Sequence, residues 1–63
     1  MNKIKEARKA KGITQVQLAE KVGVTENAIQ NYEAGRRTPD AKIILRIAQA
    51  LDTTVEKLYG AEN

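Results

Sequence analysis

Residues 14–33 read TQVQLAEKVGVTENAIQNYE, and they predict two short helices joined by a glycine turn. Thr14 and Gln17 have the spacing of a capping box, in which each side chain accepts a hydrogen bond from the other's backbone amide at a helix start. The apolar residues that follow fall on one side of a 3.6-residue turn, and they are Leu18, Ala19 and Val22. Gly23 is expected to end this helix, because glycine adopts a positive φ at little cost.

The second helix of the stretch is expected over about residues 26–34, and its two sides differ in chemistry. Thr25 is a good N-cap, and Gly35 is a good stop. One side of the helix carries Ala28, Ile29 and Tyr32, and the opposite side carries Glu26, Asn27, Gln30 and Asn31. Side-chain amides both donate and accept hydrogen bonds, which suits adenine edges in the major groove of DNA. The pattern therefore favours a helix that reads bases.

Apolar spacing predicts further helices on both sides of this stretch. Ile4, Ala7, Arg8 and Lys11 share one face of a first helix. A later helix restarts at Pro39 and Asp40, and its inward positions are Ile44, Ile47, Ala48 and Leu51. Ile43 and Leu45 flank that stripe, either as the margin of the core or as a partner surface. A last short helix, capped around Thr53 and Thr54, closes the core with Val55, Leu58 and Tyr59. The fold class expected is all-α, a compact bundle of five short helices.

Composition limits the remaining possibilities. Sixty-three residues are expected to form a single domain over 1–63, and the absence of Cys and His leaves neither a disulfide nor a zinc site of the usual kinds. No cofactor is expected. The net charge of +3 is compatible with a polyanionic partner without establishing one. The longest apolar run, residues 43–45, cannot span a bilayer, so a cytoplasmic protein without a membrane partner is expected.

The chain resembles the lambda-repressor-like helix-turn-helix family, which includes Cro, lambdoid phage repressors and Xre-type bacterial regulators. The resemblance runs from about Ile4 to Leu58. It includes the entry Gly12-Ile13-Thr14-Gln15, the exit Tyr32-Glu33-Ala34-Gly35-Arg36, and the pattern Ile47-Ala48-x-x-Leu51. The chain departs from the family at Asp52 and Thr53, where a glycine and an aliphatic residue are common.

The resemblance implies a role for each part of the motif. The helix over 26–34 would lie in the major groove, with Asn27 and Asn31 as first choices for base contacts and Gln30 and Glu26 beside them. Glu26 would either accept from cytosine N4 or support the helix terminus. Phosphate contacts are expected from Thr14, Gln15, Arg36 and Arg37, with Lys9 and Lys42 as weaker candidates. For Gln15 the alternative is an ordinary solvent-facing residue, and for the two arginines it is a solvated turn.

The resemblance also implies an ion pair between Arg8 and Glu33 that joins two helices. The alternative is an Arg8 side chain that extends to solvent or to a phosphate. Breaking a partly buried pair leaves one charge without a partner, so the role expected of the pair is structural.

The function expected is sequence-specific binding of double-stranded DNA by a transcriptional regulator. Repression is the first interpretation, and activation is the alternative. A domain this small touches few bases, so a homodimer on a palindromic operator is also expected. The dimer is expected to be weak or induced by DNA. Its contacts are expected at Val55, Tyr59 and Thr53. The competing class is a protein-interaction module of the same fold, such as an antitoxin or a transcriptional adaptor. An enzyme is not expected, because no residue pattern supplies a nucleophile with its base.

Overall fold

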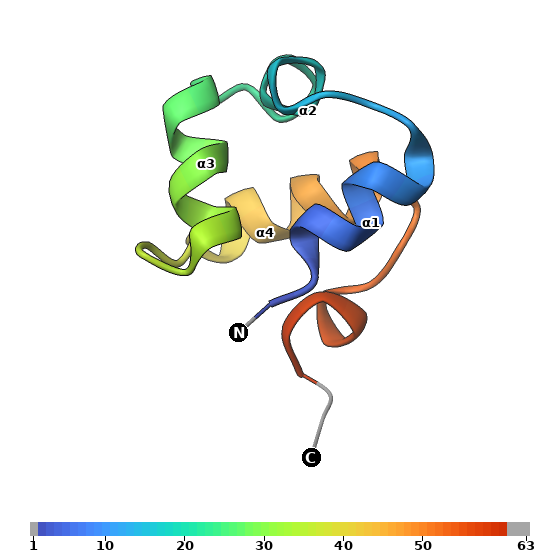
Figure 1. Ribbon diagram of the computed structural model, residues 1–63. Helices are drawn as coiled ribbons and strands as arrows, with labels where there is room; N and C mark the ends of the chain where they lie inside the picture. The colour runs from blue at the N-terminus through green and yellow to red at the C-terminus, as the bar shows by residue number, and fades with distance from the viewer. Residues whose placement is uncertain (1, 61–63) are drawn as a thin grey trace.

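The computed structural model describes residues 2–60, which form a small bundle of helices (Figure 1). Four are α-helices and the last is a short π-helix: α1 (Ile4–Lys11), α2 (Gln15–Val22), α3 (Glu26–Ala34), α4 (Ala41–Ala50) and η1 (Glu56–Gly60). The all-α fold of five short helices predicted from the sequence is confirmed. Residue 1 and residues 61–63 of the expected domain lie outside the described residues.

Capping side chains explain the starts of three α-helices. Thr14 and Gln17 form the expected capping box, with Thr14 Oγ1 accepting from Gln17 N at 3.0 Å and Gln17 Oε1 accepting from Thr14 N at 2.9 Å. Thr25 Oγ1 accepts from Ala28 N at the start of α3. Asp40 Oδ1 accepts from the backbone amide three residues later at the start of α4. Each bond satisfies a helical N–H that has no partner within its own helix.

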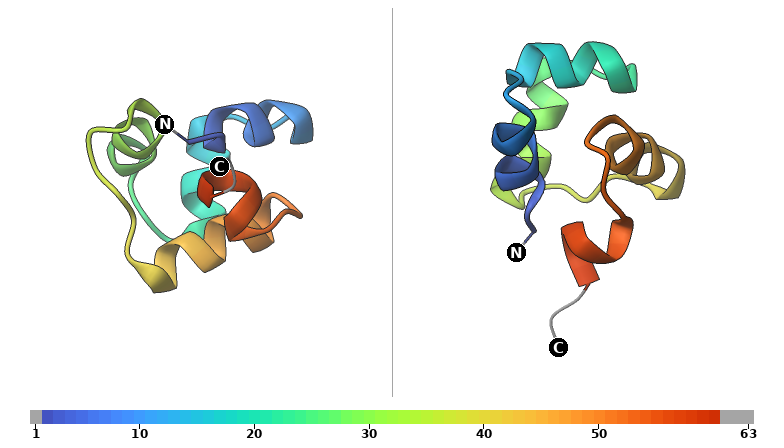
Figure 2. Two further views of the ribbon diagram at one scale, coloured as in Figure 1. Left: turned by 90° about the horizontal axis from the view of Figure 1, so that it is seen from below. Right: turned by 90° about the vertical axis from the view of Figure 1, so that its right-hand side faces the viewer.

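Buried aliphatic side chains from all five helices meet in one core. Those with less than 2% of their surface exposed are Ile4, Leu18, Val22, Ile29, Ile47 and Leu58. Helix α2 packs against both α3 and α4, and Figure 2 shows α2 lying across one end of the bundle, with α1 beside α3 below it. The core therefore fixes how α2 and α3 lie relative to one another.

Hydrogen bonds from Asn2 and Lys3 attach the start of α1 to the rest of the bundle. Asn2 Nδ2 donates to the backbone oxygen of Tyr32 at 2.7 Å, while Asn2 Oδ1 accepts from Ile4 N at 3.0 Å. Lys3 N donates to the backbone oxygen of Leu58 at 2.8 Å. The first helix is thus linked both to the end of α3 and to η1.

The turn after α4 contains a residue other than glycine that has a positive φ. Asp52 has a φ of +55°, the left-handed region that glycine usually occupies, and Asp is one of the few other residues that enter it readily. Its carboxylate forms an ion pair with Lys11 on α1. Lys11 is exposed, whereas Ile4 and Arg8 of the same helical face are buried.

Candidate nucleic-acid interface

The outer face of α3 carries the polar residues predicted to contact bases. Glu26, Asn27 and Gln30 are exposed, and Asn31 is half-buried. On the opposite face Ile29 is fully buried. The core thus holds α3 by one side and leaves the amide-bearing side at the surface.

Asn27, Asn31 and Arg36 are joined in a chain of hydrogen bonds on this outer face, which we name the amide ladder. Asn31 Nδ2 donates to Asn27 Oδ1 at 3.0 Å, and Arg36 Nε donates to Asn31 Oδ1 at 2.9 Å. Two residues predicted to contact bases and one predicted to contact phosphate are therefore in direct contact. The sequence reasoning did not anticipate this contact.

The backbone after α3 explains why Arg36 returns to the helix that it follows. Gly35 has a φ of +78°, and its N–H donates to the carbonyl of Tyr32 at 3.1 Å. Arg36 N donates to the carbonyl of Asn31 at 3.0 Å. This pair of bonds is the Schellman motif that ends many helices at a glycine. Arg37 follows in the same loop and is exposed.

The entrance of α2 holds the other two residues predicted to contact phosphate. Thr14 is exposed, and its hydroxyl oxygen and backbone N–H both take part in the capping box. Gln15 is half-buried, and its Nε2 donates to Glu33 Oε1 at 2.9 Å. Lys9 and Lys42, the weaker candidates, are both exposed.

Arg8 and Glu33 lie in contact between α1 and α3. Arg8 Nε donates to Glu33 Oε2 at 2.6 Å, and the two side chains are only 10% and 4% exposed. Arg8 Nη1 also donates to the backbone oxygen of Ile13 at 2.8 Å. Together with the bond from Gln15, these contacts tie α1, the α1–α2 connection and the start of α2 to α3. We call this set of residues, Arg8, Gln15 and Glu33, the buried network.

The residues considered for a dimer contact offer little free apolar surface. Val55 and Tyr59 are half-buried and pack against the core, and Thr53 is also half-buried. The hydroxyl of Tyr59 is buried without a hydrogen-bond partner among the described residues, and this burial raises the pKa of the phenol. Leu45 on α4 is 54% exposed, whereas Ile43 packs against the core. Of the two flanking residues of α4, Leu45 is therefore the one available to a partner.

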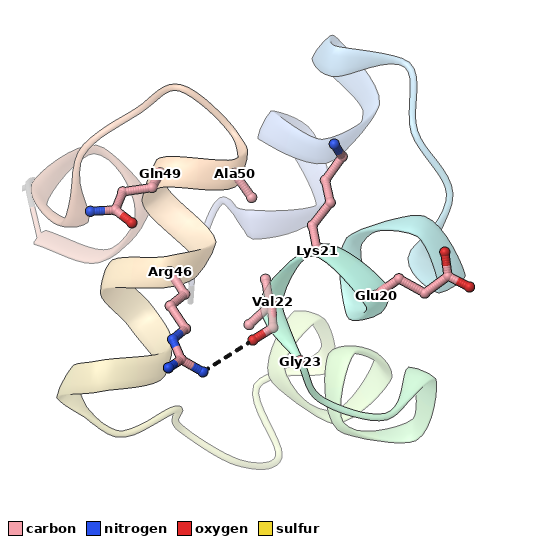
Figure 3. Close-up of a pocket in the computed structure, with 7 residues that line it drawn as sticks. All are labelled: Glu20, Lys21, Val22, Gly23, Arg46, Gln49 and Ala50. Atoms are coloured by element: carbon pink, nitrogen blue, oxygen red, sulfur yellow. Dashed lines mark hydrogen bonds between the residues drawn. The ribbon is translucent and has the colours of Figure 1, made fainter.

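A shallow depression of about 480 Å³ lies between the end of α2 and α4 (Figure 3), and no residue of the amide ladder lines it. Arg46 points across it and donates to the backbone oxygen of Val22 at 3.5 Å, while Glu20 and Lys21 point away from Arg46. A cation at the carboxyl end of a helix interacts favourably with its unpaired carbonyls. The guanidinium of Arg46 thus faces the carboxyl end of α2.

Neither a metal centre nor a membrane-spanning element is found in residues 2–60. No three residues of the His, Cys, Asp and Glu types gather there in a way that could hold a metal ion. None of the helices in this range has the length and apolar character needed to cross a bilayer.

The sequence model of the helix-turn-helix family matches residues 4–58. The chain belongs to this family. Among helix-turn-helix proteins, it is 38% identical over 60 residues to the uncharacterized HTH-type transcriptional regulator YqaE of Bacillus subtilis strain 168, a match that covers 95% of this chain and 52% of YqaE. It is 42% identical over 48 residues to multiprotein-bridging factor 1 of Candida albicans, covering 76% of this chain and 32% of that protein.

A solved helix-turn-helix structure shows the same fold. The P22 c2 repressor protein, crystallised in complex with a synthetic operator, superposes with a TM-score of 0.85 at 30% identity, covering 92% of this chain and 89% of that one. The lambda-repressor-like architecture predicted from the sequence is therefore confirmed. The chain spans about half the length of YqaE, a curated relative that it matches (52%).

Proposed function

We propose that this helix-turn-helix domain binds double-stranded DNA in a sequence-specific manner. It would be the DNA-binding part of a transcriptional regulator that represses by covering a promoter. The observation that carries the proposal is the outer face of α3, where Asn27, Gln30 and Asn31 lie at the surface of a helix whose other side is held by the core. The second helix of this motif enters the major groove, and Asn amides can pair with adenine there. The P22 c2 repressor, whose structure contains a synthetic operator, has the same fold and supports the assignment.

The proposed base contacts come from Asn27, Gln30 and Asn31, and Glu26 lies beside them on the same helix. All four belong to α3, and Glu26 is its first residue. A carboxylate at that position interacts favourably with the positive end of the helix dipole. Glu26 therefore supports the helix terminus, and the three amides read the bases.

Phosphate contacts come from both ends of the motif. Gln15 and Thr14 lie at the start of α2, where backbone N–H groups favour an anion. Arg36 and Arg37 lie in the exposed loop after α3. Contacts from two sides of the reading helix set its depth and register in the groove without selecting a sequence.

Two copies of the domain act together on a palindromic operator in this proposal. One domain touches few base pairs, and half-sites one helical turn apart supply the missing selectivity. Val55 and Tyr59 pack against the domain's own core, which leaves a small apolar surface for dimerisation. The homodimer is therefore weak in the free protein and stabilised on DNA.

We further propose that the domain acts in the cytoplasm and catalyses no reaction. The chain has no His and no Cys. The usual pairs of a nucleophile with its base are therefore not available to it.

Selection of duplexes from a random pool, followed by a salt titration, tests the DNA-binding proposal. The expected result is a selected sequence whose affinity falls by roughly one log unit per phosphate contact for each tenfold rise in salt. Asn31→Ala should lower this affinity, and Gln49→Ala is the matched control because Gln49 is an exposed amide on α4. A chain that enriches no sequence and binds duplexes without salt dependence would contradict the proposal.

An interaction module is the second candidate, and the relationship to multiprotein-bridging factor 1 favours it. The exposed Leu45 on α4 would then contact a protein partner. Leu45→Ala should lower the affinity for such a partner without changing the affinity for DNA. The opposite pattern, loss of DNA affinity with Asn31→Ala alone, favours the DNA reader.

A further inference from the structure

We infer that Arg36 is a positioning residue for base recognition: it fixes the carboxamide of Asn31 and, through it, the side chain of Asn27. This inference rests on the proposed function and goes beyond the phosphate contact expected of Arg36. The evidence is the amide ladder, in which Arg36 Nε donates to Asn31 Oδ1 and Asn31 Nδ2 donates to Asn27 Oδ1.

The chemistry of the ladder determines which way each amide faces. A guanidinium only donates hydrogen bonds, so the group of Asn31 that faces Arg36 must be its oxygen. The nitrogen of Asn31 then faces Asn27, whose oxygen must accept from it. Rotating the Asn31 amide by half a turn would place its NH₂ group against another donor. The charge on Arg36 strengthens the bond that prevents this rotation.

The backbone holds Arg36 in the position from which it orients Asn31. Arg36 N donates to the carbonyl of Asn31, so the two residues are joined through both backbone and side chain. Gly35 makes this possible with its positive φ. Asn31 is half-buried, whereas Gln30 on the same face is exposed and has no such bond among the described residues. The ladder therefore holds the side-chain amides of Asn27 and Asn31 in one orientation in the free protein.

The ladder leaves bonding capacity for DNA. Asn31 uses one of its two amide hydrogens and one of two oxygen lone pairs within the ladder, which leaves a donor and an acceptor for one base. Arg36 uses only its Nε–H, which leaves its two terminal NH₂ groups for a phosphate. One arginine would thus contact a DNA phosphate and, through Asn31, support a contact with a base. A lysine at this position keeps the charge but loses the planar fork that serves both partners.

Arg36→Lys separates the positioning role from a simple phosphate contact, and Arg37→Lys is the matched control from the same loop. The selected duplex and its three replacements at the base pair read by Asn31 are titrated with each protein. In Arg36→Lys, the ratio of the affinity for the selected duplex to that for the replaced duplexes is expected to fall about tenfold. The salt dependence of the affinity is expected to stay unchanged. Arg37→Lys alters a proposed phosphate contact without touching the ladder, so it is expected to change the affinity for all four duplexes to the same extent and to leave their ratios as in the wild type. Thermal unfolding of each variant checks that the fold is intact.

The double variant Arg36→Lys with Asn31→Ala completes the test. If Arg36 acts through Asn31, the double variant discriminates no less than Asn31→Ala alone, because the two losses share one cause. Full discrimination by Arg36→Lys, or losses that multiply in the double variant, would overturn the inference while the proposed function stands. A wild-type chain without any sequence preference would overturn both.

Discussion

Two polar networks lie on opposite sides of α3, and they are built for different tasks. The buried network joins Arg8 and Glu33, which are largely removed from solvent, with the half-buried Gln15. The amide ladder joins Asn27, Asn31 and Arg36 at the surface. Each contains an arginine bonded to an oxygen of α3. Burial distinguishes them, because a buried charge without its partner destabilises the fold, whereas an exposed one is solvated by water.

Removing the carboxylate from the buried network should produce the largest effect on the free energy of unfolding. Glu33→Ala leaves the Arg8 guanidinium buried without its partner, so a loss of about 3–5 kcal/mol is expected. Gln15 also loses its acceptor. Urea denaturation of the variant measures the change. A loss below about 1 kcal/mol would show that the network does not connect α1 to α3 as described.

The matching change in the amide ladder should affect DNA binding and leave folding nearly unchanged. Asn31→Ala is expected to weaken binding of the selected duplex by about 1–3 kcal/mol and to relax preference at one base pair. Titrations with the selected duplex and with its single-base variants measure both effects. Uniform weakening on every sequence would assign Asn31 to the DNA backbone instead of a base.

Two glycine substitutions sharpen the comparison at the level of the backbone. Gly35→Ala and Gly12→Ala each force alanine into the left-handed region, at φ of +78° and +74°, and an added Cβ would meet no atom within 4 Å at either position. Both should therefore cost roughly 1–2 kcal/mol of stability. Only Gly35→Ala should also reduce base discrimination, since Gly35 directs Arg36 toward Asn31. Equal base discrimination by the two variants would show that the turn at Gly35 does not hold the amide ladder in place.

The smallest effect is expected at the exposed ion pair of Lys11 and Asp52. The hydrogen bond and charge of Lys11 hold the pKa of Asp52 below its usual value of 3.8. A carboxyl whose pKa is lowered by folding adds stability above its unfolded pKa and loses it as the pH falls through the lowered value. Asp52→Asn should therefore be slightly less stable than the wild type at pH 7 and equal to it in strong acid. Thermal unfolding at the two pH values measures this, and a difference that persists in acid would point to the backbone of the turn instead.

Local signals in the sequence predicted most of the fold. The capping box of Thr14 and Gln17, the glycines that end α2 and α3, and the apolar spacing of α4 each depend on residues within a few positions of one another. Such local interactions do not depend on contacts with distant parts of the chain, so the sequence alone indicates them. The π-helical form of η1 was not predicted, because its pattern of polar and apolar residues is compatible with an ordinary helical turn.

Contacts between distant residues were predictable only where the family resemblance supplied them. The pairing of Arg8 with Glu33 came from that resemblance, and the contact of Gln15 with the same carboxylate was missed. The ion pair of Lys11 with Asp52 joins residues 41 positions apart, and no local pattern announces it. The contact of Arg36 with Asn31 is short in sequence, but it depends on the path that Gly35 gives the backbone.

The side-chain amides of the protein provide the most direct test that the outer face of α3 reads DNA. Nuclear magnetic resonance spectra of the ¹⁵N-labelled chain, recorded while the selected duplex is added, report each amide group separately. The NH₂ signals of Asn27, Gln30 and Asn31 are predicted to shift and to become protected from exchange, while that of Gln49 on α4 stays unchanged. Shifts confined to Gln49 and its neighbours around the depression between α2 and α4, with the three α3 amides unchanged, would contradict the account.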